Sequence, residues 1–355
     1  MRPTTAIVDL AALAHNLARA RSLAPHSKAF AVIKANAYGH GLHRAARALE
    51  AAEGYALVEL DAAVRLREAG YAQRIALLEG YFEAREIEVF AQHGLSAVIH
   101  NAGQVSMLEA HPPGAPIDVL LKVNTGMNRL GFAPAELAAC AERLRAHPAV
   151  GALTLMTHFA DADGDAGVAA QLARFQRIAA GTGLPRSLAN SAAVLRYPET
   201  HADWIRPGIM LYGCSPFAGE TGAQSGLRPA MTLTSEIIAV HDIAAGAAVG
   251  YGGAFVAERA MRIGTVACGY ADGYPRHAPT GTPLLVGDRL TRTLGRVSMD
   301  MLCADLTGLP EAHVGTRVVL WGEGNPVERV AEAAGTVGYE LLCALAPRVR
   351  VVEKT

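Results

Sequence analysis

Short apolar runs alternate with longer amphipathic segments over the first two-thirds of the chain. Eight of these runs lack regular alternation, which predicts strands buried on both faces of a parallel sheet. They lie at 29–34, 55–60, 75–78, 96–99, 117–123, 152–158, 187–190 and 204–206. Helical periodicity is found between them at 42–49, 62–68, 83–92, 102–109, 134–146 and 168–180. This order points to a (β/α)8 TIM barrel, and an open doubly wound sheet is the alternative.

The pattern changes after residue 226. Beyond a Gly- and Ser-containing stretch at 219–226, apolar and polar residues alternate, and Val, Thr and Gly are frequent. Such alternation predicts mainly antiparallel strands, and one helix is expected at 327–334. We therefore expect an α/β protein of two domains, a barrel at 1–226 and a mainly antiparallel β domain at 227–355.

Composition narrows the functional class. The 355 residues are 51% hydrophobic and 18% charged, which is typical of a chain with a large core. The formal net charge of -1 argues against a nucleic-acid-binding protein, because such proteins need a basic face. The sequence shows neither a signal peptide nor a membrane span, and its five scattered cysteines include no Cys-x-x-Cys pair. We expect a cytoplasmic protein without a disulfide framework or a metal site.

Lysine is rare in this chain. Only four of the 32 basic residues are lysines, and an arginine can neither form a Schiff base nor be carbamylated. Lys34, in AVIKANAYGHG, and Lys122 both end apolar runs, where burial lowers the pKa of an amine. Lys34 is therefore a candidate nucleophile toward a carbonyl group. The alternative is a strand-end lysine that extends into solvent.

Other polar residues end the predicted strands. Active sites of TIM barrels lie at this carboxyl edge, which here would carry His158, Asn190, Ser191 and Arg206 together with the two lysines. The loops after the seventh and eighth strands are the usual phosphate-binding corner of such barrels. Gly208, in IRPGIMLYG, would let backbone N–H groups approach an anion, although an ordinary βα turn is the alternative.

Eight segments resemble the signature blocks of the alanine racemase family. They are AVIKANAYGHG, KVNTGMNRLG, THFADAD, ANSAA, IRPGIMLYG, VGYGGAF, GYADGYPR and GRVSMD, and they follow the family's order along nearly the whole chain. The family consists of pyridoxal 5'-phosphate (PLP) enzymes with an N-terminal barrel and a C-terminal β domain. The resemblance thus implies the fold inferred above, PLP as cofactor, and the interconversion of L-alanine and D-alanine, a peptidoglycan precursor.

The resemblance also implies two catalytic bases. Lys34 would hold PLP as an aldimine and act on one face of the substrate, and Tyr251 would act on the opposite face. A phenol has a pKa near 10, so it is a weak base at neutral pH unless neighbours stabilise its anion. His158 and Arg129 match family residues that do so, in a hydrogen-bonded chain that ends at Arg206. In this family the tyrosine comes from the other subunit, which implies a homodimer with shared active sites.

Further positions match family residues that bind cofactor or substrate. Arg206 would face the pyridine nitrogen of PLP, and Lys122 matches a lysine that is carbamylated in many members and would position Arg129. Tyr270 and the backbone of Met299 match substrate-binding positions lent by the partner subunit. Phosphate contacts match Tyr38, Ser191, Gly208 and Ile209, while Arg276 and Arg296 would line the entrance.

One position departs from the family. Some members carry a tyrosine before an Arg-Val pair near the C-terminus, where this chain has Pro347 in ALAPRVRVV. A proline has no hydroxyl group, so the phosphate would lose a contact and the entrance would widen. One alternative is therefore a broad-specificity amino-acid racemase on the same scaffold. Two others that share the barrel are a non-catalytic PLP-binding protein and a PLP decarboxylase. Turnover of L-alanine, L-serine and L-lysine, with chiral analysis of the product, separates them.

Overall fold

The computed structural model describes residues 2–355 and divides into two compact units. The barrel unit comprises Leu17–Ala37 and Gly41–Leu211. The β unit comprises the N-terminal residues up to Asn16, Tyr38–His40 and Tyr212–Thr355. The domain boundary near residue 226 stays a prediction.

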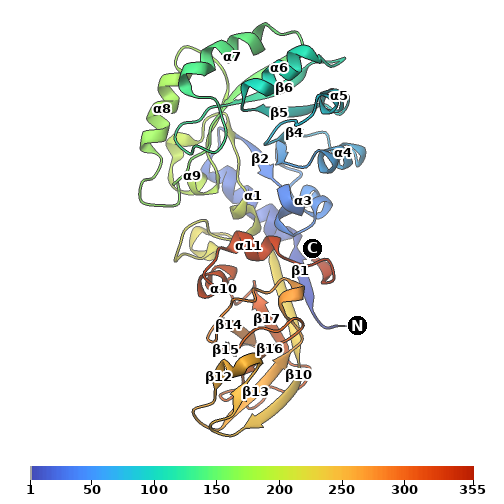
Figure 1. The fold of residues 1–355 in the computed structure, drawn as a ribbon, viewed down its shortest axis with the longest axis vertical. Coiled ribbons are helices and arrows are strands. Elements are labelled where there is room, and N and C mark those ends of the chain that lie inside the picture. Colours follow the sequence, from blue (N-terminus) through green and yellow to red (C-terminus); the bar gives the residue numbers. More distant parts are fainter. Residues whose placement is uncertain (1) are drawn as a thin grey trace. The chain divides into compact units, whose positions relative to one another are not determined.

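The barrel unit is a closed parallel barrel of eight strands, as the apolar runs predict (Figure 1). The strands are β2 (Lys28–Val32), β3 (Gly54–Leu57), β4 (Arg74–Leu77), β5 (Leu95–Ile99), β6 (Ile117–Lys122), β7 (Val150–Met156), β8 (Arg186–Ser187) and β9 (Trp204–Ile205). Parallel pairing of β2 with β9 closes the ring. All five residues of β5 are buried, which explains its continuous apolar run. The TIM-barrel prediction is confirmed, and the open-sheet alternative is wrong.

Helices follow the barrel strands along the chain. They are α3 (Leu42–Ala48), α4 (Leu60–Glu68), α5 (Ala84–Gln92), α6 (Ala102–Ala110), α7 (Pro134–Ala146), α8 (Ala169–Ala179) and α9 (Ser191–Arg196). The first six match the predicted helical segments. The short α9 was not predicted, and its N-terminus is capped by Asn190, whose side-chain oxygen accepts a hydrogen bond from the Ala193 N–H.

The β unit is built on an eight-stranded sheet with the order β13-β16-β15-β14-β17-β10-β1-β18. Its strands are β1 (Thr5–Asp9), β10 (Met231–Ile243), β13 (Met261–Val266), β14 (Pro283–Val286), β15 (Arg289–Leu294), β16 (Leu302–Asp305), β17 (Arg317–Trp321) and β18 (Arg350–Lys354). All pairs in this sheet are antiparallel except β1 with β18. A separate ribbon joins β11 (Ala248–Val249) to β12 (Phe255–Val256). The prediction of a mainly antiparallel C-terminal region is confirmed.

Two features of the β unit were not predicted. The N-terminal strand β1 pairs with β10 and β18, and its alternating burial suits a sheet with one covered face. The helix expected at 327–334 is α10 (Val327–Ala333), but a second helix, α11 (Gly338–Cys343), follows it. The helix α1 (Leu10–Leu23), which follows β1, was also missed.

We predict that Gly39→Ala destabilises the protein more than Gly70→Ala. Both glycines have positive φ (80° and 88°), so each substitution carries the left-handed penalty of about 1 kcal/mol. Only at Gly39 would the added Cβ collide with a backbone oxygen, that of Leu342, and such overpacking costs a further ~1–3 kcal/mol. Urea unfolding followed by circular dichroism measures the difference, and equal losses for the two variants would contradict the packing.

Candidate functional site

Lys34 lies just beyond the carboxyl end of β2 and begins an unusual turn. The next four residues, Ala35 to Tyr38, all have φ between 51° and 55°, although none is glycine. Left-handed backbone in such residues costs about 1–2 kcal/mol each, so local contacts must compensate. The Ala37 N–H donates to the Ile33 carbonyl at 2.9 Å, and Asn36 accepts from the Leu42 N–H at 2.9 Å. The turn therefore holds Lys34 at the rim through a specific backbone conformation.

Five of the predicted site residues come together at this rim of the barrel unit. Lys122 ends β6, Arg129 and His158 follow β6 and β7, and Arg206 follows β9. Besides burial, the charges of Arg206, Arg129 and Lys34 lower the pKa of Lys122 and also that of His158, so these side chains lie close enough to interact. Four cationic side chains and one imidazole therefore lie together at the ends of the strands, as the sequence predicts.

Lys122 lies at the centre of this positive charge. Its side chain is buried, and burial followed by the charges of Arg206 and Arg129 lowers the pKa of its amine to about 8. Glu79 opposes the shift, but within residues 2–355 no carboxylate lies within 4.0 Å of the amine. A larger share of Lys122 is therefore uncharged at neutral pH than for an ordinary lysine, and an uncharged amine can react with an electrophile.

His158 is held as a neutral imidazole. Burial, followed by the charges of Arg206 and Lys122, lowers its pKa well below the ordinary value. The Arg206 guanidinium donates to Nδ1 at 3.4 Å, so Nδ1 is the acceptor. The remaining hydrogen is thus on Nε2, which leaves His158 a hydrogen-bond donor at that atom.

Arg206 is held by hydrogen bonds to the ends of two neighbouring strands, β7 and β8. Its guanidinium donates to the Ser187 hydroxyl at 2.7 Å and to the carbonyl groups of Thr157 and Leu188 at 2.6 and 3.0 Å. Burial lowers its pKa to about 10, which still leaves it protonated at neutral pH. These hydrogen bonds thus hold the Arg206 charge in a defined position at the rim.

The predicted phosphate corner is also formed. The Ser191 hydroxyl oxygen accepts hydrogen bonds from the N–H groups of Gly208 (2.8 Å) and Met210 (3.3 Å). Between them, the buried Ile209 N–H has no acceptor among the described residues. Buried backbone donors are rarely left unpaired, so this N–H fits a site for an external anion.

The remaining predicted residues belong to the β unit. Tyr38 is buried and stacks on Tyr212 with a centroid separation of 4.6 Å. Tyr251 is 72% exposed, an unusual environment for a large aromatic side chain. Tyr270 and Met299 lie together, because the Tyr270 and Ala271 N–H groups donate to the Ser298 and Met299 carbonyls at 3.0 and 2.9 Å.

The two predicted entrance arginines are both exposed on the β unit. Arg296 lies beside the turn of Tyr251, with its Nη1 atom 3.4 Å from the position that a Cβ on Gly252 would take. Arg276 ends the GYADGYPR segment.

Sequence reasoning missed two polar residues at the barrel rim. Glu79 follows β4 and His100 follows β5. The charge of Glu79 raises the pKa of Lys122 against the larger effect of burial, while burial and then the charge of Lys122 lower the pKa of His100. His100 Nε2 lies 3.2 Å from the Glu79 carbonyl oxygen. The signal was available, because each residue comes directly after an apolar run, as Lys122 does.

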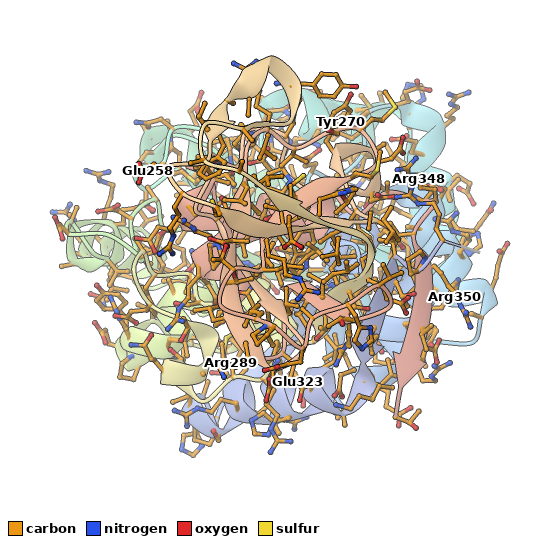
Figure 2. All side chains as sticks on the ribbon, turned by 90° about the horizontal axis from the view of Figure 1, so that it is seen from below. Glu258, Tyr270, Arg289, Glu323, Arg348 and Arg350 are labelled. Atoms are coloured by element: carbon orange, nitrogen blue, oxygen red, sulfur yellow. The ribbon has the colours of Figure 1, made fainter. Side chains whose placement is uncertain are left out.

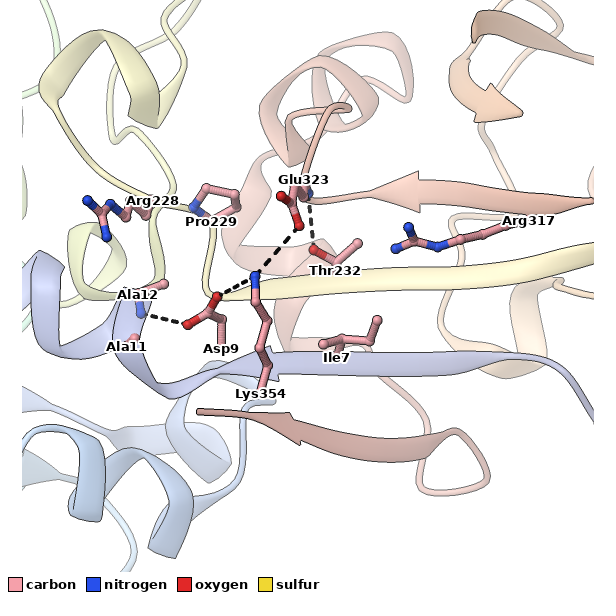
Figure 3. Close-up of a pocket in the computed structure, with 10 residues that line it drawn as sticks. All are labelled: Ile7, Asp9, Ala11, Ala12, Arg228, Pro229, Thr232, Arg317, Glu323 and Lys354. Atoms are coloured by element: carbon pink, nitrogen blue, oxygen red, sulfur yellow. Dashed lines mark hydrogen bonds and ion pairs between the residues drawn. The ribbon is translucent and has the colours of Figure 1, made fainter. Parts of the chain in front are cut away.

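A cavity of about 410 Å³ in the β unit contains none of these residues (Figure 3). Its lining includes Lys354, which forms ion pairs with Asp9 at 3.0 Å and Glu323 at 3.9 Å. These pairs satisfy the charges of Lys354, Asp9 and Glu323 within the chain, and we assign the cavity no ligand. Over residues 2–355, no group of His, Cys, Asp or Glu suits a metal ion, and no helix is long and apolar enough to cross a membrane.

Comparison with known proteins identifies the class. A family model described as the alanine racemase N-terminal domain matches residues 8–216, and one described as its C-terminal domain matches 230–353. The chain is 60% identical to an alanine racemase of Nitrosospira multiformis and 56% identical to one of Burkholderia mallei, with 99% of each chain covered in both cases. The crystal structure of a biosynthetic alanine racemase from Pseudomonas aeruginosa superimposes with a TM-score of 0.98, 50% identity and 100% of both chains covered.

The barrel with its β domain thus defines a racemase, an enzyme of the isomerase class. In particular, the chain belongs to the alanine racemase family. The resemblance drawn from the signature segments is confirmed.

We predict that Lys122→Met stabilises the protein at pH 7 and loses this advantage at high pH. An unfolded lysine has a pKa near 10.5 and the folded Lys122 one of about 8, so between these values the unfolded chain binds the extra proton. The free energy of unfolding of the wild type therefore rises with pH across this window. The stability gained by Lys122→Met is at most about 3 kcal/mol at pH 7 and falls toward zero as the pH approaches 10.5.

Calorimetry in CO2-free buffer between pH 7 and 10.5 measures this difference. Lys354→Met is a control of opposite sign, because a hydrogen bond to Asp9 raises the pKa of Lys354. That substitution should destabilise the protein, and the loss should disappear at high pH. A pH-independent effect of Lys122→Met would contradict the interpretation.

Proposed function

We propose that this protein interconverts L-alanine and D-alanine with PLP as cofactor. The observation that carries the proposal is the convergence of Lys34, Lys122, Arg129, His158 and Arg206 at one barrel rim. The names of its full-length relatives support the substrate.

The residues at the rim suit PLP. The Lys34 amine is available to bond an aldehyde, while the Ser191 hydroxyl and the unpaired Ile209 N–H can bind a phosphate. When bound, PLP draws electrons from an attached amino acid and so makes its Cα–H more acidic. Arg206 would face the ring nitrogen, and a guanidinium does not give up its proton as a carboxylic acid does. This weakens electron withdrawal and favours proton exchange over transamination.

Two bases on opposite faces carry out the proton transfer in this proposal. Lys34 takes or returns the proton on one face of Cα, and Tyr251 of the partner subunit acts on the other. The neutral His158 can donate its Nε2–H to the phenol oxygen, which stabilises the anion that a tyrosine base requires. Arg206, bound to Nδ1, keeps the imidazole in the required tautomer.

In this proposal the substrate carboxylate is bound by a positively charged side chain, a tyrosine and a backbone group. Arg129, Tyr270 and the backbone of Met299 are the proposed contacts, the last two from the partner subunit. Carbamylation of Lys122 would convert its amine into an anion, which offsets the surrounding positive charge and orients Arg129. The partly uncharged state of Lys122 supports this reaction with CO2.

A homodimer with shared sites is part of the proposal. The high exposure of Tyr251 and the exposed side chains of Tyr270 and Met299 support their use by a second copy of the chain. The cytoplasmic location expected from the sequence belongs to the same proposal.

We predict that Lys34→Ala abolishes both covalent PLP attachment and racemisation. The change removes the only amine that the proposal assigns to the cofactor aldehyde. Borohydride reduction followed by peptide mass mapping locates the modified lysine in the wild type. Lys28→Ala, at the exposed start of the same strand, is the matched control and should keep both properties. Attachment at another lysine would refute the assignment.

We predict that Tyr251→Phe retains PLP but lowers kcat at least about 100-fold in both directions, the usual scale for loss of a general base. Each base reaches the proton of one enantiomer only. Exchange of the Cα proton with D2O should therefore persist for one alanine enantiomer and disappear for the other, as NMR would detect. Tyr71→Phe, which alters a tyrosine with no assigned role, should behave as wild type. Full activity of Tyr251→Phe would remove the two-base scheme.

A further inference from the structure

Four charged residues of the β unit form a closed group, which we call the Asp272 network. It consists of Arg2, Asp272, Asp300 and Arg348. The buried Asp272 carboxylate accepts hydrogen bonds from Arg2 at 2.9 Å and Arg348 at 2.7 Å. Asp300 completes the group through Arg348 at 2.7 Å and Arg2 at 3.5 Å. Two carboxylates and two guanidinium groups thus alternate, and the network has no net charge.

The network holds the segment that carries Tyr270. Asp272 ends the short helix η5 (Tyr270–Asp272), and its carboxylate also accepts a hydrogen bond from the Gly269 N–H at 3.0 Å. A Cβ at position 269 would collide with the carbonyl oxygens of Ser298 and Met299. The turn is therefore packed directly against the Met299 loop, and the same loop carries Asp300.

The network also binds the C-terminal segment that contains Pro347. The Ala346 N–H donates to the Asp272 carbonyl at 3.2 Å, and Arg348 donates to the Asp272 carboxylate. Pro347 lies between these two attachments and is exposed. The position that departs from the family is thus tied to the turn that carries Tyr270, and Figure 2 shows Tyr270 and Arg348 on the same side of this unit.

Within the network, Asp272 alone is buried, whereas its three partners are partly exposed, as are Tyr270 and Met299. Asp272 is 1% exposed, whereas Tyr270 and Met299 are 37% and 53% exposed. Desolvation of the buried Asp272 carboxylate offsets much of its attraction to the two guanidinium groups, so the ion pairs add little net stability while they set the positions of their partners. The arrangement suits a rigid base that presents two exposed residues to a second molecule.

We propose that Asp272 is a positioning residue, which through Arg2 and Arg348 fixes the Tyr270 turn and the Met299 loop for substrate binding in the partner subunit's site. This inference rests on the proposed function. It goes beyond it by assigning a role to four residues to which the proposed function gives no contact with the cofactor or the reacting atoms.

The test is Asp272→Asn in the PLP-loaded enzyme. Replacing one carboxylate oxygen by NH2 sets that group against the donors which the oxygen had bound, Arg348 at Oδ1 or Arg2 and the Gly269 N–H at Oδ2. The turn should therefore loosen. We expect the KM for alanine to rise about tenfold while kcat changes less than about threefold, the signature of weakened substrate positioning. Hydrogen exchange of the Tyr270 and Ala271 amides should accelerate at least about tenfold, because their partners are the carbonyls of the Met299 loop.

Asp305→Asn is the matched control. Asp305 is also largely buried in the β unit and accepts a hydrogen bond from Arg292 at 3.1 Å, but it belongs to β16 and does not contact the network. It should change neither KM nor the exchange of residues 270 and 271. An equal rise in KM for both variants would overturn the proposal, as would an unchanged KM for Asp272→Asn with or without faster exchange.

Two further measurements keep the outcome clear. If Asp272→Asn yields no folded protein, Arg348→Lys keeps the charge but loses the two-pronged contact, and KM should rise about threefold with kcat retained. An unchanged KM in that variant would overturn the proposal. If the wild-type enzyme itself does not racemise alanine, the proposed function fails, whereas the exchange measurement still reports whether Asp272 orders the turn.

Discussion

Positive charge concentrated at the barrel rim is the constraint on which the proposed site depends. Lys34, Lys122, Arg129 and Arg206 lie near one another, and Glu79 is the acidic group that acts on Lys122 against them. Burial of like charges is unfavourable unless a proton is lost or an anion is bound. The low pKa values of Lys122 and His158 are the first response, and in the proposed function the binding of a phosphate and a carboxylate is the second. In the proposed function, this unfavourable concentration of charge is what binds the anionic groups.

Backbone geometry supplies the second requirement, which is accurate placement. The left-handed turn after Lys34 and the strand-end hydrogen bonds of Arg206 both hold a functional side chain by main-chain groups. In the β unit, the Asp272 network does the same for Tyr270 and Met299 with side-chain charges. In each case, strained backbone or a buried charge lies next to a proposed functional residue and holds that residue in one position.

Much of the fold could be predicted because its signals are local. The barrel strands appear as continuous apolar runs, and six of its helices appear as amphipathic periods between them. The elements that were missed depend on distant partners or are very short. β1 acquires its role by pairing with β10, which lies more than 200 residues further along the chain, and α9 has only six residues. The rim residues were found because strand ends are recognisable, yet Glu79 and His100 were overlooked in the same positions.

By itself, the sequence determined the barrel, the antiparallel region after it, the family, and the lysines capable of amine chemistry, since these follow from periodicity, residue type and motif. Only the tertiary structure decided which charges act on one another. The pKa of Lys122, the tautomer of His158 and the joining of Arg2 to Arg348 through Asp272 depend on distances of a few ångströms between residues far apart in the chain. Electrostatic energy depends on separation and burial, and neither can be read from the order of residues.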